Sequence, residues 1–524
     1  MLLFEGTSLK HYVSERLLLD TDLLQIHDKQ RIGLVGRNGN GKTTLLNIIK
    51  GEVFPDEGKV NQFTSIKLVP QFKNVNIRKS GGEITQVYLQ TAFNESPGLL
   101  LLDEPTTHLD YERIVWLENN LHDFLGAVLI VSHDRAFLDH ICTEIWEIED
   151  ASITVYKGNY SDYANQKTLE RKQHQIAFEK YEKEKQKIEE AIRIKEEKAQ
   201  RATKKPKNLG ASDARQKGAK PFYANKQKKL RKTASAFETK LEQLKEVEQP
   251  RELPPIKMDV INEHALNNKI IIRGEEVSGK IGENLLWYPF NFHVLSGEKT
   301  AVIGSNGSGK TTLLEKIIDE GQGISISPVV KIGYFSQHIT ILKDQISILE
   351  NVQLSSKQNE TMIRTVLARM QFRNDDVYKK VAMLSGGEKV KVALAKLFLS
   401  NVNMLLLDEP TNFLDIESLE ALETLIKDYR GTVIFVTHDR MFIKNVATKI
   451  IELENKEVTV FDGTYEAYKE RVKHPKNDEN KDKLLLIETK ISDVLARLSL
   501  EPSKELDEEF QRLLKEKKKL INRS

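Results

Sequence analysis

The chain lacks several features that would direct it to other compartments. Its 524 residues include a single cysteine, Cys142, so no intramolecular disulfide can form and no cysteine cluster can hold zinc. No stretch approaches the roughly 20 consecutive apolar residues that a membrane span needs. Residues 1–22 also lack the basic start and apolar core of a secretory signal. We therefore expect a protein of the reducing cytosol without membrane contact.

A large net charge is also absent, but the charge is unevenly distributed. The 79 basic and 77 acidic residues leave a formal charge of only +2. From Lys198 to Lys232, however, there are 13 Lys or Arg residues and one acidic residue, Asp213, a local charge of +12. A chain of this length holds about two to four domains. The average composition therefore hides one strongly basic central segment.

The chain contains one long internal repeat. Residues 36–43, GRNGNGKT, return as GSNGSGKT at 304–311, an offset of 268. Three later motifs return at an offset of 305, namely SGGE (80–83 and 385–388), DEPT (103–106 and 408–411), and SHDR (132–135), which becomes THDR (437–440). Gln71 and Gln337 lie in similar contexts at an offset of 266. The first copy therefore lacks 37 residues between its glycine-rich motif and its SGGE motif, and the deletion falls after the glutamine.

The glycine-rich motif is specific for a phosphate-binding loop. In each copy it follows an apolar strand and precedes an apolar helix, so that backbone N–H groups and the helix N-terminus can surround phosphates. Lys42 and Lys310 are expected to contact the β- and γ-phosphates of ATP, and Thr43 and Thr311 to ligate Mg²⁺. The predicted ATP-binding residues of the loops are Gly36, Asn38, Gly39, Gly41, Lys42, Thr43, Thr44, Gly304, Asn306, Gly307, Gly309, Lys310, Thr311 and Thr312.

Each DEPT motif follows an apolar run and begins with two carboxylates. Asp103 and Asp408 are expected to hold Mg²⁺ through water, while the next residue polarises the attacking water. A histidine that follows a further apolar strand is placed to hydrogen-bond the γ-phosphate. The predicted catalytic residues are Glu104, Glu409, His133 and His438.

The order of phosphate loop, glutamine, SGGE, carboxylates and histidine resembles that of the ABC superfamily. The resemblance implies two cassettes packed head to tail around two ATP molecules, with each SGGE motif facing the other cassette's loop. It also implies that the missing 37 residues have reduced the helical subdomain of the first cassette. On this basis the further ATP-binding residues are Ser80, Gly81, Gly82, Ser385, Gly386, Gly387, Gln71 and Gln337, the two glutamines also being metal ligands.

Adenine recognition is less regular than phosphate recognition. Tyr12 lies 24 residues before Gly36, where ABC cassettes often place a stacking aromatic. In the second copy the same register leads to Lys280, and Trp287 is the nearest large aromatic. Tyr12 is therefore a candidate for adenine stacking, and the second copy receives no firm assignment.

Between the copies, residues 166–247 are rich in Glu, Lys, Arg, Gln and Ala. Pro206, Gly210, Gly218 and Pro221 interrupt a helical pattern, and a second helical run is predicted from about Gln227 to Glu248. Two helices around such a break predict an antiparallel hairpin with its tip near 206–222. The local charge of +12, with Phe222 and Tyr223 inside it, favours nucleic-acid contact over a merely solvated helix pair.

Two cassettes joined by a charged helical linker resemble the ABC-F family, and the segments KKPKNL, KGAKPFYANKQKKLRKT, TYEAYKE and LDEPTNFLD resemble its Vga-type resistance group. The resemblance implies binding at the E site of the 70S ribosome, near 23S rRNA and P-site tRNA. The linker tip would then displace streptogramin A, lincosamide and pleuromutilin drugs from the peptidyl-transferase centre. The implied tip residues are Leu209, Gly210, Ala211, Ser212, Lys217, Phe222 and Tyr223.

The expected fold is α/β. It comprises a first ABC domain (1–160), a helical hairpin (161–255, tip about 206–223), a second ABC domain (256–470) and a C-terminal helical extension (471–524). We expect a Mg²⁺-dependent ATPase that works as an intramolecular cassette pair in a monomer. The alternatives are a housekeeping translation factor, the motor subunit of a drug exporter and a DNA-repair ATPase.

Overall fold

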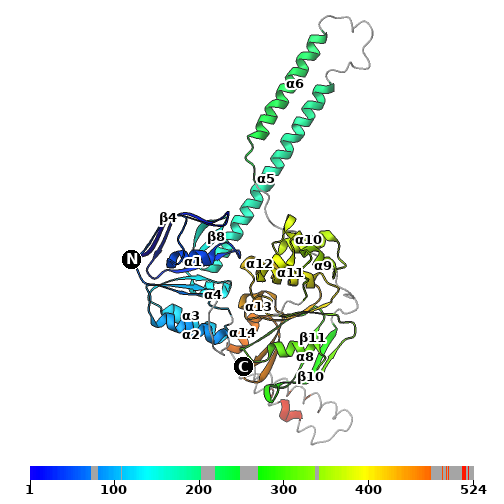
Figure 1. Ribbon diagram of the computed structural model, residues 1–524. Helices are drawn as coiled ribbons and strands as arrows, with labels where there is room; N and C mark the ends of the chain where they lie inside the picture. The colour runs from blue at the N-terminus through cyan, green and yellow to red at the C-terminus, as the bar shows by residue number, and fades with distance from the viewer. Residues whose placement is uncertain are drawn as a thin grey trace. The chain divides into compact units, whose positions relative to one another are not determined.

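The computed structural model describes residues 1–71, 81–107, 109–201, 219–247, 269–336, 341–473, 487, 491, 494, 510–514 and 517. The chain forms two compact units. One combines Met1–Asn159 with Pro255–Ser524 and holds both cassettes, and the other is Tyr160–Pro254. Figure 1 labels the elements of both units.

The first cassette contains two sheets. An antiparallel sheet has the order β2-β1-β4, from β1 (Leu2–Val13), β2 (Arg16–His27) and β4 (Glu57–Gln62). A six-stranded sheet has the order β5-β6-β7-β3-β8-β9, in which all neighbours are parallel except β8 and β9. Its strands are β3 (Arg31–Gly36), β5 (Ile66–Val69), β6 (Leu99–Asp103), β7 (Ala127–Val131), β8 (Glu144–Glu149) and β9 (Ser152–Lys157). The helices are α1 (Lys42–Lys50), α2 (Gly81–Asn94), α3 (Tyr111–Asp123) and α4 (Arg135–Ile141).

The second cassette repeats this plan. Its antiparallel sheet has the order β11-β10-β13, from β10 (Ile270–Ile281), β11 (Asn284–Leu295) and β13 (Ile324–Ile326). Its six-stranded sheet, β14-β15-β16-β12-β17-β18, contains β12 (Lys299–Gly304), β14 (Ile332–Phe335), β15 (Met404–Asp408), β16 (Thr432–Val436), β17 (Lys449–Glu454) and β18 (Glu457–Asp462). The helices are α8 (Lys310–Ile318), α9 (Ile348–Gln353), α10 (Glu360–Arg369), α11 (Gly386–Phe398), α12 (Ile416–Asp428), α13 (Arg440–Val446) and α14 (Tyr465–Lys473). The predicted α/β fold class is confirmed.

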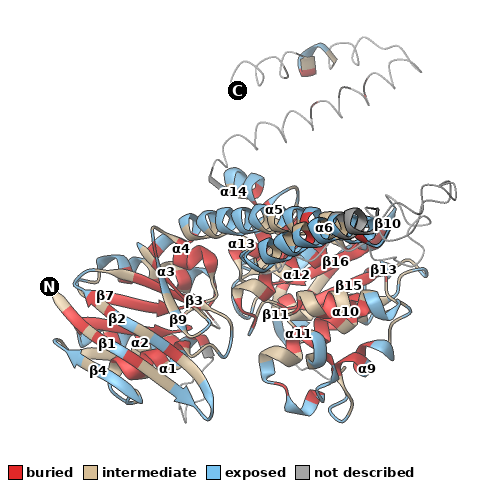
Figure 2. Cartoon of the chain, turned by 90° about the horizontal axis from the view of Figure 1, so that it is seen from above, coloured by how far each residue is buried: buried red, intermediate tan, exposed pale blue. Residues whose placement is uncertain are grey.

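The central strands explain why the apolar runs precede the site residues. Every residue of β6, β7, β15 and β16 is buried. Figure 2 shows the buried strands in red and labels β7, β15 and β16. Parallel strands that are covered on both faces need continuous apolar sequences such as LLLL and VIFV. The polar residues that follow these strands therefore emerge together at one edge of each sheet.

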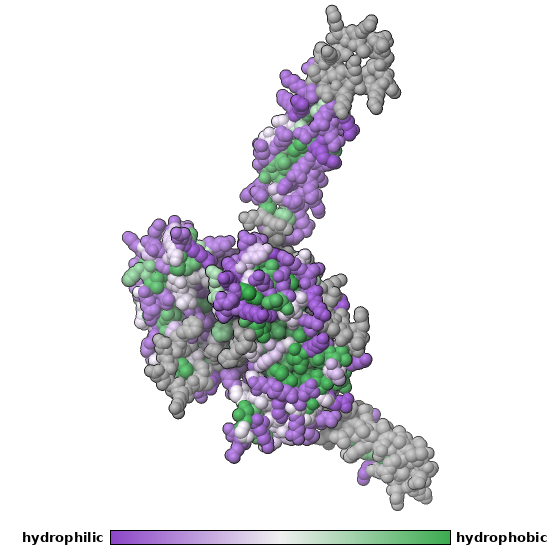
Figure 3. All heavy atoms as spheres, turned by 45° about the vertical axis from the view of Figure 1, so that its right-hand side comes forward, coloured by the Kyte–Doolittle hydropathy of each residue, from purple (hydrophilic) through white to green (hydrophobic). Residues whose placement is uncertain are grey.

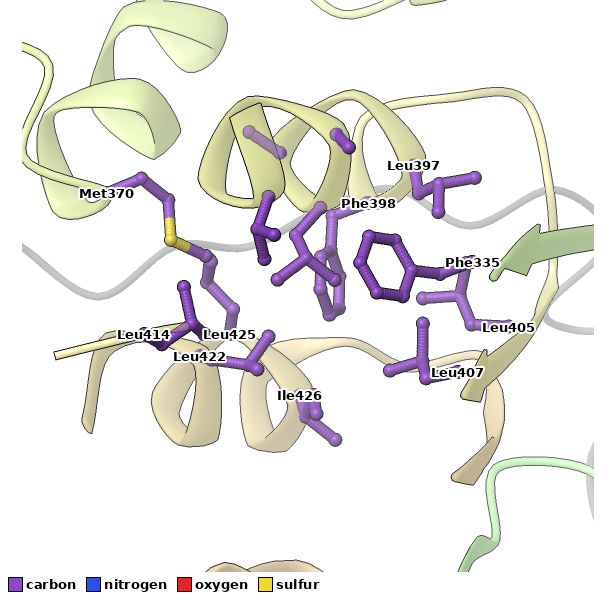
Figure 4. Close-up of a cluster of buried hydrophobic side chains, with 14 of the residues drawn as sticks. Phe335, Met370, Leu397, Phe398, Leu405, Leu407, Leu414, Leu422, Leu425 and Ile426 are labelled. Atoms are coloured by element: carbon purple, nitrogen blue, oxygen red, sulfur yellow. The ribbon is translucent and has the colours of Figure 1, made fainter. Parts of the chain in front are cut away.

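The two cassettes differ most between the glutamine and SGGE. In the second cassette, α9, α10 and two short 3-10 helices, Asn374–Tyr378 and Val381–Met383, precede α11. Figure 4 shows Met370, Phe398 and Phe335 packed together with side chains of α12. In the first cassette, α2 begins only ten residues after Gln71, whereas α11 begins 49 residues after Gln337.

The second unit is a pair of packed helices, α5 (Tyr160–Arg201) and α6 (Ala219–Glu242). Ile188, Ala199 and Ala234 are buried, and Lys240 Nζ lies 3.2 Å from Glu184 Oε1. The face of the pair that Figure 3 shows is mostly hydrophilic, with an apolar stripe along it.

The predicted boundaries of the second hairpin helix were wrong. Helix α6 runs from Ala219 to Glu242 instead of from about Gln227 to Glu248. Pro221 does not break α6 because it lies in the first turn, where backbone N–H groups have no intrahelical partner. Phe222 and Tyr223 consequently lie on this helix, whereas Leu209, Gly210, Ala211, Ser212 and Lys217 lie outside the described residues.

Most of the predicted C-terminal extension lies outside the described residues. Residues 487, 491, 494, 510–514 and 517 are helical, and Ile487, Val494 and Leu513 are buried. Among all described helices, none combines the length and hydropathy required to cross a membrane.

Candidate functional site

The first phosphate loop joins β3 to α1, and its glycines leave the loop backbone uncovered by side chains. Gly39 and Gly41 have φ of 81° and 86°, a left-handed conformation that glycine adopts without a steric penalty. The loop curls around the ammonium group of Lys42, which donates to the carbonyl oxygens of Gly36 at 2.7 Å and Arg37 at 3.0 Å. Thr43 Oγ1 donates to Asp103 Oδ2 at 2.8 Å.

The second loop has nearly the same geometry. Lys310 Nζ donates to the carbonyl oxygens of Gly304 and Ser305, both at 2.9 Å. Thr311 Oγ1 donates to Asp408 Oδ2 at 2.9 Å. Each predicted pair of Mg²⁺ ligands, threonine and aspartate, is therefore already assembled.

The glutamate and histidine of each cassette also lie together. Glu104 Oε1 lies 3.4 Å from His133 Nε2, and the same atoms of Glu409 and His438 are 3.4 Å apart. The Glu104 backbone donates to the Val131 carbonyl at 2.9 Å, which ties the end of β6 to β7. The two residues can therefore act on the same bound group.

Burial shifts the ionisation of these residues strongly. Burial, despite the nearby lysine ammonium groups, raises the pKa of Glu104 and of Glu409 to about 8. Burial and the charge of Lys42 lower the pKa of His133 to about 3, and burial with Lys310 lowers that of His438 to about 4. Both histidines are thus neutral at pH 7, so each can present either a donor or an acceptor.

The residues fit ATP and a divalent cation. Lys42 and Lys310 are buried, and burial lowers their pKa values. Among the described residues the ammonium group of each donates to carbonyl oxygens of its own loop, so a bound anion would compensate its charge. Asp408 Oδ1 and Glu104 Oε1 are buried and have no hydrogen-bond partner in the part of the chain that the structure describes. Carboxylate and hydroxyl oxygens are the ligands that Mg²⁺ prefers.

The second cassette contacts the first phosphate loop directly. Asp415 Oδ2 accepts from the Asn38 backbone at 3.3 Å, and Asn38 Nδ2 donates to the Phe413 carbonyl at 3.2 Å. A Cβ on Gly387 would lie 3.5 Å from Asn38 Nδ2, so the second SGGE motif lies beside this loop. Ser385 caps α11 in a box with Glu388, which sets the start of that helix.

The second phosphate loop shares a cavity with the first SGGE motif. The cavity has a volume of about 510 Å³ and is lined by Gly82, Asn306, Gly307, Glu409 and His438, among others. Glu104, His133 and Gln71 also line it. The structure thus brings each loop together with residues of the other cassette's SGGE motif.

Several predicted residues are not placed together in this way. Ser80 and Gln337 lie outside the described residues, and Gly81 is described only as the first residue of α2. Tyr12 is half-exposed on β1, a position compatible with stacking. Trp287 is fully buried beneath Gly309, so it cannot present its face to a base.

The sequence analysis missed the ion pair that joins the cassettes at the first phosphate loop. Arg37 Nε lies 2.8 Å from Glu417 Oε2. Within the second cassette, Lys391 Nζ lies 3.2 Å from Asp415 Oδ2 and so holds the carboxylate that contacts Asn38. Burial would raise the pKa of Asp415, but Lys391 and bonds from Ser418 lower it to about 2. Arg37 lies inside the phosphate-loop motif, so its position was visible in the sequence, although its partner, 380 residues away, was not.

The comparisons with known proteins agree with this geometry. A family profile described as ABC transporter matches residues 19–77 and 288–412, and a second profile of that description matches 146–220. The erythromycin resistance ATP-binding protein MsrA of Staphylococcus epidermidis is 34% identical over 484 residues, covering 86% of this chain and 97% of the relative. The chain belongs to the ABC-F family. As an ABC-F protein it binds and hydrolyses ATP.

Two further similar proteins have names that refer to the ribosome. The ribosome protection protein VmlR of Bacillus subtilis (strain 168) is 30% identical to this ABC-F chain, with 98% and 97% of the two chains covered. A solved complex of an archaeal ribosomal stalk protein and the archaeal ribosome recycling factor aABCE1 matches with a TM-score of 0.59 at 17% identity, covering 88% and 90%. The latter similarity concerns the fold alone.

Proposed function

We propose that this ABC-F ATPase is a ribosome-protection factor of the Vga type. It binds the E site of the 70S ribosome and extends its hairpin tip, residues 206–223, toward the peptidyl-transferase centre. There it displaces streptogramin A, lincosamide and pleuromutilin drugs. The observation that carries the proposal is the charge of +12 over residues 198–232, a segment that includes the end of α5 and the start of α6 and is encoded between two ATPase cassettes. The names of MsrA and VmlR support it.

The helix pair has the chemistry for RNA. Helix α6 begins with AKPFYANKQKKLRK and contains no acidic residue before Glu238. Helix α5 instead mixes acidic and basic residues, as in the ion pairs of Arg193 with Glu190 and Arg201 with Glu197. Unpaired cations release counterions from a phosphate backbone, whereas internally paired ones contribute little. We therefore assign 23S rRNA contacts to the start of α6 and the tip, near P-site tRNA.

The proposed roles at the first ATP site follow the geometry above. Lys42 and the loop amides hold the phosphates, while Thr43, Asp103 and Gln71 hold Mg²⁺, which when bound neutralises phosphate charge. Glu104 orients the attacking water, and His133 hydrogen-bonds the γ-phosphate. Ser385, Gly386 and Gly387 close the site from the other cassette, and Tyr12 stacks on adenine.

The second ATP site has matching roles. Lys310, Thr311, Asp408, Gln337, Glu409 and His438 take the corresponding positions, closed by Ser80, Gly81 and Gly82. ATP-driven closure of the sandwich within one monomer fixes the hairpin on a cytoplasmic ribosome, and hydrolysis releases it. The domains are those expected above, 1–160, 161–255, 256–470 and 471–524.

The first test is ribosome trapping. The variant carrying Glu104→Gln and Glu409→Gln keeps both ATP sites but lacks the carboxylates that orient water. It should co-sediment with ribosomes in ATP and not in ADP. Lys42→Ala with Lys310→Ala, which removes phosphate binding, is the matched control. Failure of the glutamine variant to co-sediment would overturn the proposal.

The second test separates drug protection from a housekeeping role in translation. Purified protein is added to an in vitro translation reaction inhibited by a streptogramin A or a lincosamide. Rescue supports protection and requires no export. Ribosome binding without rescue would instead favour a translation factor without a drug role, and a variant lacking residues 206–223 should bind without rescuing.

A further inference from the structure

Two equivalent ion pairs join the cassettes outside the phosphate loops. Arg135 begins α4 directly after His133-Asp134, and its guanidinium pairs with Glu423 on α12 of the second cassette. Arg440 begins α13 directly after His438-Asp439, and its Nη1 lies 3.2 Å from Glu118 Oε1 on α3 of the first. Both arginines and both glutamates are related by the offset of 305. The two pairs are therefore one contact made twice.

These pairs are buried. The side chains of Arg135 and Arg440 are 4% and 8% exposed, and those of Glu118 and Glu423 are 14% and 8% exposed. Because desolvation of two charges offsets much of their attraction, a buried ion pair contributes little net stability over an apolar pair. Stability alone is thus a weak reason for the same buried pair at two places.

Each pair connects two elements of one ATP site. Helix α12, which carries Glu423, is capped by Asp415, and Asp415 contacts Asn38 in the loop of Lys42. Arg135 follows His133, which serves that same site. The first pair therefore ties the histidine of the site to the helix that approaches it from the other cassette.

The second pair does the same at the other site. Helix α3, which carries Glu118, is capped by Asp110. Asp110 lines the same cavity as Gly304 and Ser305, so it lies close to the loop of the second site. Arg440 follows His438, the histidine of this site.

The two pairs also meet. Arg135 Nη2 lies 3.6 Å from Asp439 Oδ2, so an arginine of one histidine segment contacts the other segment. Burial, together with the carboxylate of Asp439, raises the pKa of Asp134 to about 6. The six residues of this ionic cluster are Glu118, Asp134, Arg135, Glu423, Asp439 and Arg440.

Arg440 does not use all the hydrogen-bond donors of its guanidinium. Its Nε and Nη2 are buried and have no hydrogen-bond partner among the described residues, and its guanidinium lies 4.7 Å from the ring centroid of Tyr111. The corresponding ring position in the other half is Ile416. Arg440 can therefore gain bonds if the cassettes shift, which a fully satisfied interface would resist.

We propose that the ionic cluster couples the two ATP sites, with Arg135 and Arg440 as positioning residues that transmit the state of each histidine segment to the other. ATP at one site sets the position of its histidine, and the adjoining arginine shifts the helix and the histidine segment of the other cassette. The coupling acts on ATP binding, and it does not depend on the proposed ribosomal function.

The test measures cooperativity of ATP binding without ribosomes. In the Glu104→Gln/Glu409→Gln background, labelled ATP with Mg²⁺ is titrated and bound nucleotide is counted by equilibrium dialysis. Two molecules should bind cooperatively, with a coupling factor of at least about fivefold. Adding Arg135→Met should leave two sites but reduce the coupling factor to about one.

Controls distinguish coupling from a damaged fold. Arg364→Met removes an exposed ion pair with Glu360 and should leave cooperativity unchanged. The reversal Arg135→Glu/Glu423→Arg should restore part of the cooperativity that Arg135→Met loses. Non-cooperative binding by the parent, or unchanged cooperativity in Arg135→Met with two sites retained, would overturn the proposal. If Arg135→Met fails to fold, Arg440→Met provides the same comparison from the other half.

Discussion

At the scale of single residues, two glutamates occupy a backbone conformation that costs free energy. Glu104 and Glu409 have φ of 49° and 50°, a region that costs a non-glycine residue roughly 1–2 kcal/mol. The conformation recurs in both copies, and in each the carboxylate lies beside the histidine. Strain that the surrounding fold holds in place is typical of functional positions.

The two phosphate loops differ at two positions, and one of these, Arg37 against Ser305, changes a contact between the cassettes. Arg37 pairs with Glu417, whereas the matching residues, Ser305 and Glu112, line a cavity of about 520 Å³. Arg37→Ser should weaken ATP at the first site by about two- to fivefold, since a half-exposed pair contributes up to about 1 kcal/mol. The measurement is ATP affinity in single-site variants.

The second loop supplies the matched change for that prediction. Ser305→Arg places a guanidinium opposite Glu112 and should tighten ATP at the second site by a similar factor. Loss of affinity at both sites in Arg37→Ser would instead indicate a general defect of the loop, contrary to the prediction.

A buried lysine outside the ATP sites makes stability depend on pH. Lys299 Nζ donates to the carbonyls of Tyr429 at 2.7 Å and Gly431 at 2.5 Å, and burial lowers its pKa to about 7. The unfolded chain keeps this proton to a higher pH, so folding releases it and this site's contribution to stability rises from pH 7 toward 10. Relative to Lys299→Met, the wild type should gain about 2 kcal/mol between pH 7 and 9. The measurement is the free energy of unfolding of both proteins at pH 7 and pH 9. The same difference between wild type and Lys299→Met at the two pH values would contradict the prediction.

At the scale of elements, α9 and α11 begin with the same type of helix cap, so the loss of the cap can be compared between them. Ser385 caps α11 and Ser347 caps α9, each in a box with the glutamate three residues later. Replacing either serine by alanine should destabilise the second cassette by about 1 kcal/mol. Only Ser385→Ala should also reduce ATP hydrolysis, because its helix faces the first phosphate loop. Equal loss of activity in Ser347→Ala would make the effect one of stability alone.

Element identity was predictable where local signals are strong, and boundaries were not. The phosphate loops, the buried strands before the carboxylates and the two linker helices follow from glycine spacing, apolar runs and helical patterns. The start of α6 was misplaced by eight residues, since Gly218 and Pro221 resemble a break although proline is tolerated in a first turn.

The contacts that complete the sites could not be read from the sequence. Asn38 and Asp415 are 377 positions apart, and Arg135 and Glu423 are 288 apart. No local pattern joins such pairs; only the packing of one cassette against the other does so. The repeated SHDR and THDR motifs held the signal, but only their histidines were assigned a role.

At the scale of the whole molecule, charge on the helix pair should control ribosome affinity and leave the ATP sites alone. Replacing Lys228, Lys229, Arg231 and Lys232 of α6 by glutamine should weaken ribosome binding. Each lost phosphate contact should lower the slope of log affinity against log salt by about 0.7–0.9. ATP hydrolysis without ribosomes should stay unchanged, because these residues belong to a separate compact unit.

The control for that prediction lies on the neighbouring helix. Lys183, Lys185, Lys187 and Lys195 of α5 are interspersed with glutamates, and the same change there should have a smaller effect on the salt slope. Equal effects from both sets would indicate a general electrostatic attraction in place of a contact by α6.

The reciprocal arginine–glutamate contact bears on where such a chain comes from. A surface that carries both an arginine and its complementary glutamate can bind a second copy of itself about a twofold axis. A single ancestral cassette with Arg and Glu at these places would have formed a homodimer through the same contact, made twice. Gene duplication and fusion would then preserve that contact while freeing each copy to diverge, one losing its helical subdomain and the other keeping it.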